Sequence, residues 1–130
     1  KDFVNSEKSI TNAILLCEKS NNIDSYLYSR ILYLAAFFYS NVEPLNYDLS
    51  EKYFLKIINL DDYNEFRVKS FNCLALLYFV KSDFINAELM ILEALKTKKD
   101  NKIEDNYDSL YYLNLIYFLK SYKHFYKHTT

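Results

Sequence analysis

The feature of this sequence that most constrains its fold is the complete absence of glycine, together with a single proline, Pro44. Sheet-rich folds and phosphate-binding loops rely on glycine, because glycine adopts positive φ without a steric penalty. Helix interiors need neither residue and are weakened by both. The sequence therefore favours an all-α fold.

Composition and charge narrow the class of protein further. The chain has 130 residues, of which 51% are hydrophobic and 25% charged, as in a globular domain with a core. Its net charge of −1 provides no field that would attract nucleic acid or an anionic membrane. The longest apolar run, 31–39, is less than half of the roughly 20 residues that span a bilayer. We expect an intracellular, cytoplasmic protein with neither a nucleic-acid nor a membrane partner.

Two further features bear on the state of the chain. Cys17 and Cys73 lie in apolar helical settings. This favours two buried thiols, and a disulfide between them is the alternative. Because the sequence begins at Lys1 rather than Met, we expect it to be a fragment of a longer chain.

Hydrophobic periodicity predicts a row of helices. Apolar residues recur at helical spacing over about 6–20, 24–40, 48–60, 62–81, 84–97 and 107–119. A basic segment, 120–127, either continues the last helix or forms a short seventh one. The second, fourth and sixth helices are apolar nearly all round, whereas the first, third and fifth are amphipathic. This alternation is expected in stacked antiparallel hairpins, whose inner helices have more neighbours than the outer ones.

Polar residues mark the ends of these helices. Asn21 and Asn22 close the first helix, in the role that glycine usually takes. Three helix starts carry an acidic N-cap, two of them with a glutamate three residues later as in a capping box: Asp24, Asp48 with Glu51, and Asp62 with Glu65.

An internal repeat appears when the predicted helices are aligned. The inner helices share the pattern Leu34-Ala35-x-x-Phe38, Leu74-Ala75-x-x-Tyr78 and Leu113-Asn114-x-x-Tyr117, with steps of 40 and 39 residues. Such steps are in the range of helical solenoids. The outer helices align Ser50, Phe54 and Ile57 with Ala87, Ile91 and Ala94. Small residues at these positions let two helix backbones approach closely.

The best repeat unit, 71–95, resembles the tetratricopeptide repeat family. The matching residues are the aromatic, leucine, small and alanine positions of that family's signature: Phe71, Leu74, Ala75, Tyr78, Ala87, Ile91 and Ala94. Ser82-Asp83 followed by Phe84 stands where the family has its Gly-Asp-aromatic turn. The resemblance implies one domain over 1–130, a right-handed solenoid of about six to seven antiparallel helices, and an ordinary helical bundle is the alternative fold. Its helix pairs would be about 24–60, 62–97 and 107–128, with 1–20 as an outer helix without a pair.

The resemblance also implies a non-enzymatic scaffold that binds a partner protein or peptide. In that family the inner helices line a concave groove. Fourteen tyrosines and ten phenylalanines would make such a groove apolar and aromatic. Core packing is the alternative role for any one of these residues, and self-association the alternative mode of binding. We expect Phe79 and Tyr111 to flank one pocket. Alignment with the family assigns the following residues to the partner-binding groove: Tyr39, Lys69, Asn72, Leu76, Phe79, Tyr111, Leu115 and Phe118.

No motif indicates catalysis. The sequence has no nucleotide-binding glycine loop, zinc-protease, nucleophile-elbow or EF-hand pattern. His124 and His128 have the spacing of one helical face, but no third ligand accompanies them, which favours a solvated basic tail. We expect no enzyme activity, no metal and no cofactor. The basic tail, 120–128, is the alternative binding surface.

A second function remains open. Sensor domains of bacterial quorum-sensing-type transcription regulators, which bind peptides, also use long, aromatic-rich pairs of tetratricopeptide type. A helix-turn-helix domain elsewhere in a longer chain would favour that function over a scaffold.

Overall fold

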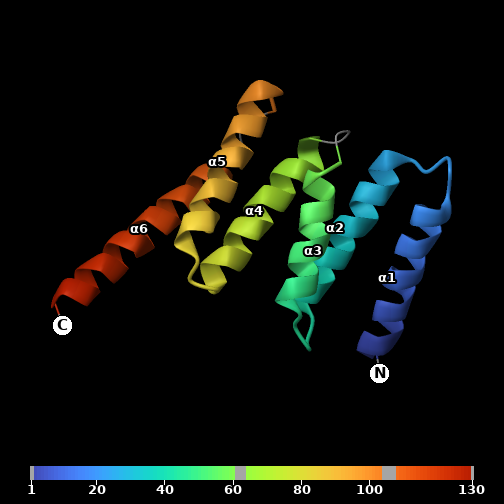
Figure 1. Ribbon diagram of the computed structural model, residues 1–130, viewed down its shortest axis with the longest axis horizontal. Helices are drawn as coiled ribbons and strands as arrows, with labels where there is room; N and C mark the ends of the chain where they lie inside the picture. The colour runs from blue at the N-terminus through green and yellow to red at the C-terminus, as the bar shows by residue number, and fades with distance from the viewer. Residues whose placement is uncertain (1, 61–63, 104–107, 130) are drawn as a thin grey trace. The chain divides into compact units, whose positions relative to one another are not determined.

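A computed structural model describes residues 2–60, 64–103 and 108–129, and within these ranges the side chains of 64, 108, 119 and 122–129 are not described. The described residues form helices and connecting turns, with no strand among them, which confirms the all-α expectation. The helices are α1 Asp2–Lys19, α2 Ser25–Asn41, α3 Tyr47–Ile58, α4 Asn64–Val80, α5 Phe84–Asp100 and α6 Asp108–Thr129 (Figure 1). The last helix continues through the basic segment, so no separate seventh helix follows Leu119.

The chain forms two compact units whose boundary lies inside α4. The first unit, 1–70, holds α1, α2, α3 and the start of α4. In it, α2 packs against both α1 and α3, and Tyr33 of α2 lies 5.9 Å from Phe66 of α4 between ring centroids. The second unit, 71–130, holds the rest of α4 with α5 and α6. Its core joins all three helices through Ala75, Ala87, Ile91 and Ile116.

Polar contacts hold α1 to the helix pair that follows it. The Tyr39 hydroxyl of α2 donates to Glu7 Oε2 at 3.0 Å. Near the other end of α1, Glu18 Oε2 accepts from the Tyr28 hydroxyl at 3.1 Å and from Lys56 Nζ at 2.8 Å. The hydrogen bond between Glu18 and Lys56 lowers the pKa of the carboxyl group and raises the pKa of the ammonium. The helix expected to be unpaired therefore contacts both α2 and α3.

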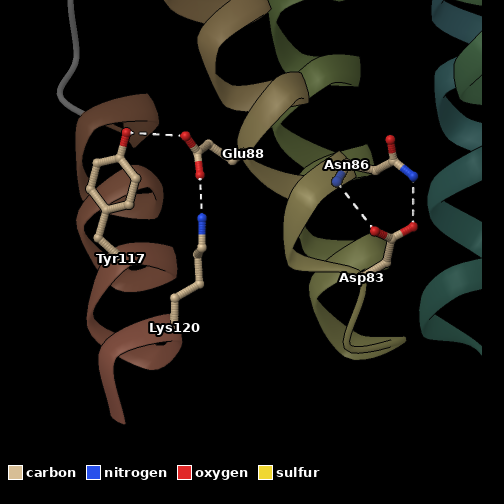
Figure 2. A network of polar contacts seen from close by, with 5 residues as sticks. All are labelled: Asp83, Asn86, Glu88, Tyr117 and Lys120. Atoms are coloured by element: carbon tan, nitrogen blue, oxygen red, sulfur yellow. Dashed lines mark hydrogen bonds and ion pairs between the residues drawn. The ribbon is translucent and has the colours of Figure 1, made fainter. Parts of the chain in front are cut away.

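Small residues and polar pairs join the other helices. Ser50 of α3 donates to the Ala36 carbonyl at 2.6 Å, a contact that only short side chains permit. In the second unit, Glu88 of α5 accepts from the Tyr117 hydroxyl at 3.4 Å and from Lys120 Nζ at 2.8 Å (Figure 2). Ser109 of α6 donates to Asn72 Oδ1 of α4 at 3.0 Å.

Of the predicted N-cap residues, one is confirmed by the structure and another is wrong. The Tyr26 amide donates to the predicted cap Asp24 at 3.0 Å. Asp83 caps α5, accepting from both the backbone amide and the side-chain amide of Asn86 (Figure 2). The prediction of Asp48 as a cap is wrong, because Asn46 Oδ1 accepts from the Leu49 amide and α3 begins at Tyr47. Asp48 instead lies in the first turn, where the helix dipole favours an acidic residue. The predicted cap Asp62 is outside the described residues.

Two helices end on left-handed residues that are not glycine. Ser82 has φ 62° and Lys102 has φ 52°. Around Ser82, the Asp83 amide donates to the Tyr78 carbonyl at 2.8 Å and the Ser82 amide to the Phe79 carbonyl at 2.9 Å, which is the Schellman pattern. Asn21 and Asn22, predicted to replace glycine, do not adopt positive φ.

Burial shows that the 40-residue step between the first two inner helices is wrong by one residue. It pairs Leu34, 54% exposed, with Leu74, which is fully buried. A step of 39 pairs buried residues with buried residues: Leu32, Ala35 and Ala36 of α2 with Phe71, Leu74 and Ala75 of α4. One residue of slip rotates a helix by about 100°, so the sequence alignment selected the wrong face of α2. In the outer helices, by contrast, all six aligned residues, including Ser50 and Ala87, are buried.

Candidate partner-binding groove

The predicted binding residue Tyr39 is part of the core. Its side chain is 3% exposed and its hydroxyl donates to Glu7. Burial and this hydrogen bond raise the pKa of Tyr39 to about 12. A side chain in this position joins α1 to α2, and the one-residue register error explains its selection. We therefore leave Tyr39 out of the candidate site.

Lys69 is exposed, but its charge is already paired. Its ammonium lies 3.1 Å from Glu65 Oε1, one turn earlier on α4. It also lies 5.5 Å from the ring centroid of Phe66, a cation–π contact. The positive charge of Lys69 is thus neutralised by a residue of its own helix.

The predicted residues of the second unit fall into two groups. Asn72 is engaged with Ser109, Phe79 packs edge-on against Phe84 with centroids 5.6 Å apart, and Leu115 is half-buried. These three serve internal packing at least in part. The exposed group is Leu76 at 36%, Tyr111 at 64% and Phe118 at 64%.

The expectation that Phe79 and Tyr111 flank one pocket does not fit the register of α4 and α6. These helices run in the same direction (Figure 1), and the Asn72–Ser109 bond sets their relative level. Phe79 lies seven residues beyond Asn72, whereas Tyr111 lies two beyond Ser109. At 1.5 Å per residue they differ by roughly 7.5 Å along the axes.

A hollow in the first unit lies between α1 and α2, and we call it the α1/α2 groove. It encloses about 550 Å³. Leu34 is 54% exposed and Phe37 50% exposed, so the groove opens to solvent. Phe3 stacks on Phe38 with ring centroids 5.0 Å apart and joins the two helices beside it. The lining consists of Asn5, Ser6, Ser9 and Ile10 of α1, Leu34, Phe37 and Phe38 of α2, and Val42.

The local sequence explains why the groove stays open. On the α1 side, Ser6 and Ser9 have short side chains that cannot cover Leu34 and Phe37 on the α2 side. Exposed apolar surface costs roughly 25 cal/mol for each Å². Large apolar residues that share one hollow are therefore a stronger sign of an interaction site than single exposed ones.

A positive charge extends the exposed stripe of α2. Arg30, Leu34 and Phe37 follow the i, i+4, i+7 spacing of one helical face. All three are exposed. At the 39-residue step, Arg30 and Phe37 correspond to Lys69 and Leu76 of α4. The sequence alignment missed both α2 residues because it placed the step at 40.

No family model, curated protein or solved structure matches the chain. Across the described ranges, no helix is both long and apolar enough to cross a bilayer. The same part of the chain contains no group of three or more His, Cys, Asp or Glu residues placed to hold a metal ion. Cys17 is buried, Cys73 is half-buried, and neither forms a disulfide. The side chains of His124, His128, Lys123 and Lys127 are outside the described residues.

Proposed function

We propose that this protein is a non-enzymatic interaction module that binds a segment of a partner protein in the α1/α2 groove. The observation that carries the proposal is the half exposure of Leu34 and Phe37 within one apolar hollow. Small-molecule sites usually enclose most of their ligand, whereas this hollow is open along exposed side chains. An open apolar groove suits a polypeptide segment, which covers it from one side.

We further propose that the helices form a solenoid of tetratricopeptide type, which would make the module a scaffold. Burial supports this in two ways, since the buried face of α2 recurs in α4 at a step of 39 and that of α3 recurs in α5 at a step of 37. The left-handed Ser82 stands where the family has glycine, which also supports the resemblance. Solenoids of stacked hairpins offer extended surfaces that bind other proteins.

The energetic basis of binding would be burial of anchors rather than long-range charge. Fully burying a leucine or phenylalanine side chain contributes roughly 1.5–3 kcal/mol. Both anchors are only half exposed, so each contributes part of that amount. The chain carries a net charge of −1, so little electrostatic steering accompanies association.

The test is affinity capture from extracts of the source cells with three forms of the full chain. The groove variant combines Leu34→Glu and Phe37→Glu. Its matched control combines Val4→Glu and Ile85→Glu, which alter residues of 61% and 73% exposure that do not line the groove. Circular dichroism establishes that all three are equally helical. We expect a bound protein that wild type and control retain and the groove variant loses. Equal retention by all three forms would contradict the proposal.

A further inference from the structure

The α1/α2 groove is lined by uncharged and mostly apolar surface, and one positively charged residue lies a helical turn before it on α2. None of its eight lining residues carries a charge. Arg30 lies one turn before Leu34 on the exposed stripe of α2 and is exposed to solvent. Within the described part of the chain, Arg30 has no acidic partner. The groove therefore combines apolar contact with one unbalanced cation.

The corresponding cation on α4, Lys69, is neutralised by a carboxylate of its own helix, whereas Arg30 on α2 is not. Lys69 corresponds to Arg30 at the 39-residue step, and Glu65 neutralises it from one turn earlier at 3.1 Å. The residue that corresponds to Glu65 in α2 is Tyr26, which has no carboxylate. An intrahelical partner is thus present on α4 and missing on α2. The guanidinium of Arg30 remains available to a carboxylate from outside.

The walls of the groove favour a helical occupant over an extended one. The walls are helices α1 and α2, whose backbone groups are largely satisfied internally. An extended segment would leave those of its amides and carbonyls that face the groove unpaired against apolar side chains, and this is costly. A helix satisfies its backbone before it binds and inserts side chains at i, i+3, i+4 and i+7. From Arg30 to Val42, the residue that caps the C-terminus of α2, the chain covers roughly 18 Å, the length of about three helical turns.

Resting on the proposed function, we propose that the occupant is an amphipathic helix of a partner protein that places a carboxylate beside Arg30. Its apolar face fills the hollow against Leu34 and Phe37. Its acidic residue extends about one turn past the apolar contacts and accepts from the guanidinium. Arginine binds carboxylates in a planar, two-pronged geometry, so this contact also fixes the direction in which the helix lies.

The experiment is a selection on the full chain from a displayed library of 18-residue helices. Every member carries the apolar i, i+4, i+7 pattern, and Glu, Gln and Lys are equally represented at the flanking positions. A parallel library of proline-containing extended segments has the same apolar content. Binders are selected against the wild type and then measured against Arg30→Glu, the Leu34→Glu/Phe37→Glu groove variant, and the Val4→Glu/Ile85→Glu control.

We expect helical binders that are enriched in Glu at one flanking position. Their affinity should fall roughly two- to five-fold in Arg30→Glu, the range for an exposed ion pair. A peptide with Lys at that position should recover affinity for Arg30→Glu, and both effects should weaken at high salt. The groove variant should lose the binders, and the control should keep them.

Each other outcome overturns a defined part of the proposal. Binders that need Leu34 and Phe37 but show no preference for Glu would overturn the acidic partner and leave the proposed function standing. Binders drawn mainly from the extended library would overturn the helical occupant. A failure to obtain any groove-dependent binder would contradict the proposed function as well. Self-association of the chain in light scattering, abolished by the groove variant, would assign the groove to a second copy.

Discussion

At the scale of single residues, this chain stops its helices without glycine. Ser82 and Lys102 hold left-handed φ values of 62° and 52° that glycine would adopt without strain. For an L-residue this conformation costs roughly 1–2 kcal/mol. The Schellman hydrogen bonds around each residue, and the packing of the helices they terminate, hold the backbone in place.

This strain leads to a prediction about Ser82. Replacing Ser82 with glycine should relieve the strain, partly offset by the greater freedom of glycine in the unfolded chain. We expect the free energy of unfolding to rise by roughly 0.5–1 kcal/mol. Chemical denaturation monitored by circular dichroism measures it. Ser9→Gly, inside α1, is the control and should instead lower stability by a similar amount. A loss of stability in Ser82→Gly would contradict the strained turn.

At the scale of helices, the contact between α1 and α2 depends on a buried phenol. Tyr39 is 3% exposed, its hydroxyl donates to Glu7, and its pKa is raised to about 12 from 10. The folded state therefore holds the phenolic proton more tightly than the unfolded state. This contribution to stability is complete below pH 10 and is lost as the pH rises from 10 to 12.

The corresponding prediction concerns Tyr39→Phe. This variant should lose stability less steeply than wild type between pH 10 and 12, because it has no proton to release at that position. At neutral pH it should be less stable by roughly 0.5–1.5 kcal/mol, the worth of one hydrogen bond. Thermal melts across this pH range measure both effects, with Tyr111→Phe as an exposed control. Identical pH slopes for Tyr39→Phe and wild type would mean that the phenol does not titrate as the structure indicates.

Periodicity predicted the presence and order of the helices, because apolar spacing and caps such as Asp24 are local properties. It could not determine the register between them. Ala35 and Ala36 are adjacent, so a sequence alignment can match either of them to Ala75 as the small residue of the repeat. The sequence alignment used Ala35, whereas the burial pattern pairs Ala36 with Ala75. This one-residue choice moved Tyr39 into the predicted site and left Arg30 and Phe37 out.

At the scale of the whole molecule, the sequence predicted exposed apolar and aromatic side chains but not the groove between α1 and α2. Leu76, Tyr111 and Phe118, which were predicted to line a binding surface, are each exposed to solvent, and their role in binding stays a prediction. The α1/α2 groove could not be predicted, since it depends on how far Ser6 and Ser9 leave α2 uncovered. That depends on the packing distance between two helices, which periodicity does not encode.

The measurement that tests the α1/α2 groove most directly uses a single tryptophan as a local reporter. The chain has no tryptophan, so Phe37→Trp introduces the only one, in the groove, and Phe118→Trp introduces one at the exposed face predicted from sequence. Each variant is titrated with a helical peptide from the selection, and emission and acrylamide quenching are recorded. We expect the Phe37→Trp emission to shift to shorter wavelength and its quenching to fall, while Phe118→Trp stays unchanged. A response from Phe118→Trp with none from Phe37→Trp would contradict the groove and place binding on α6.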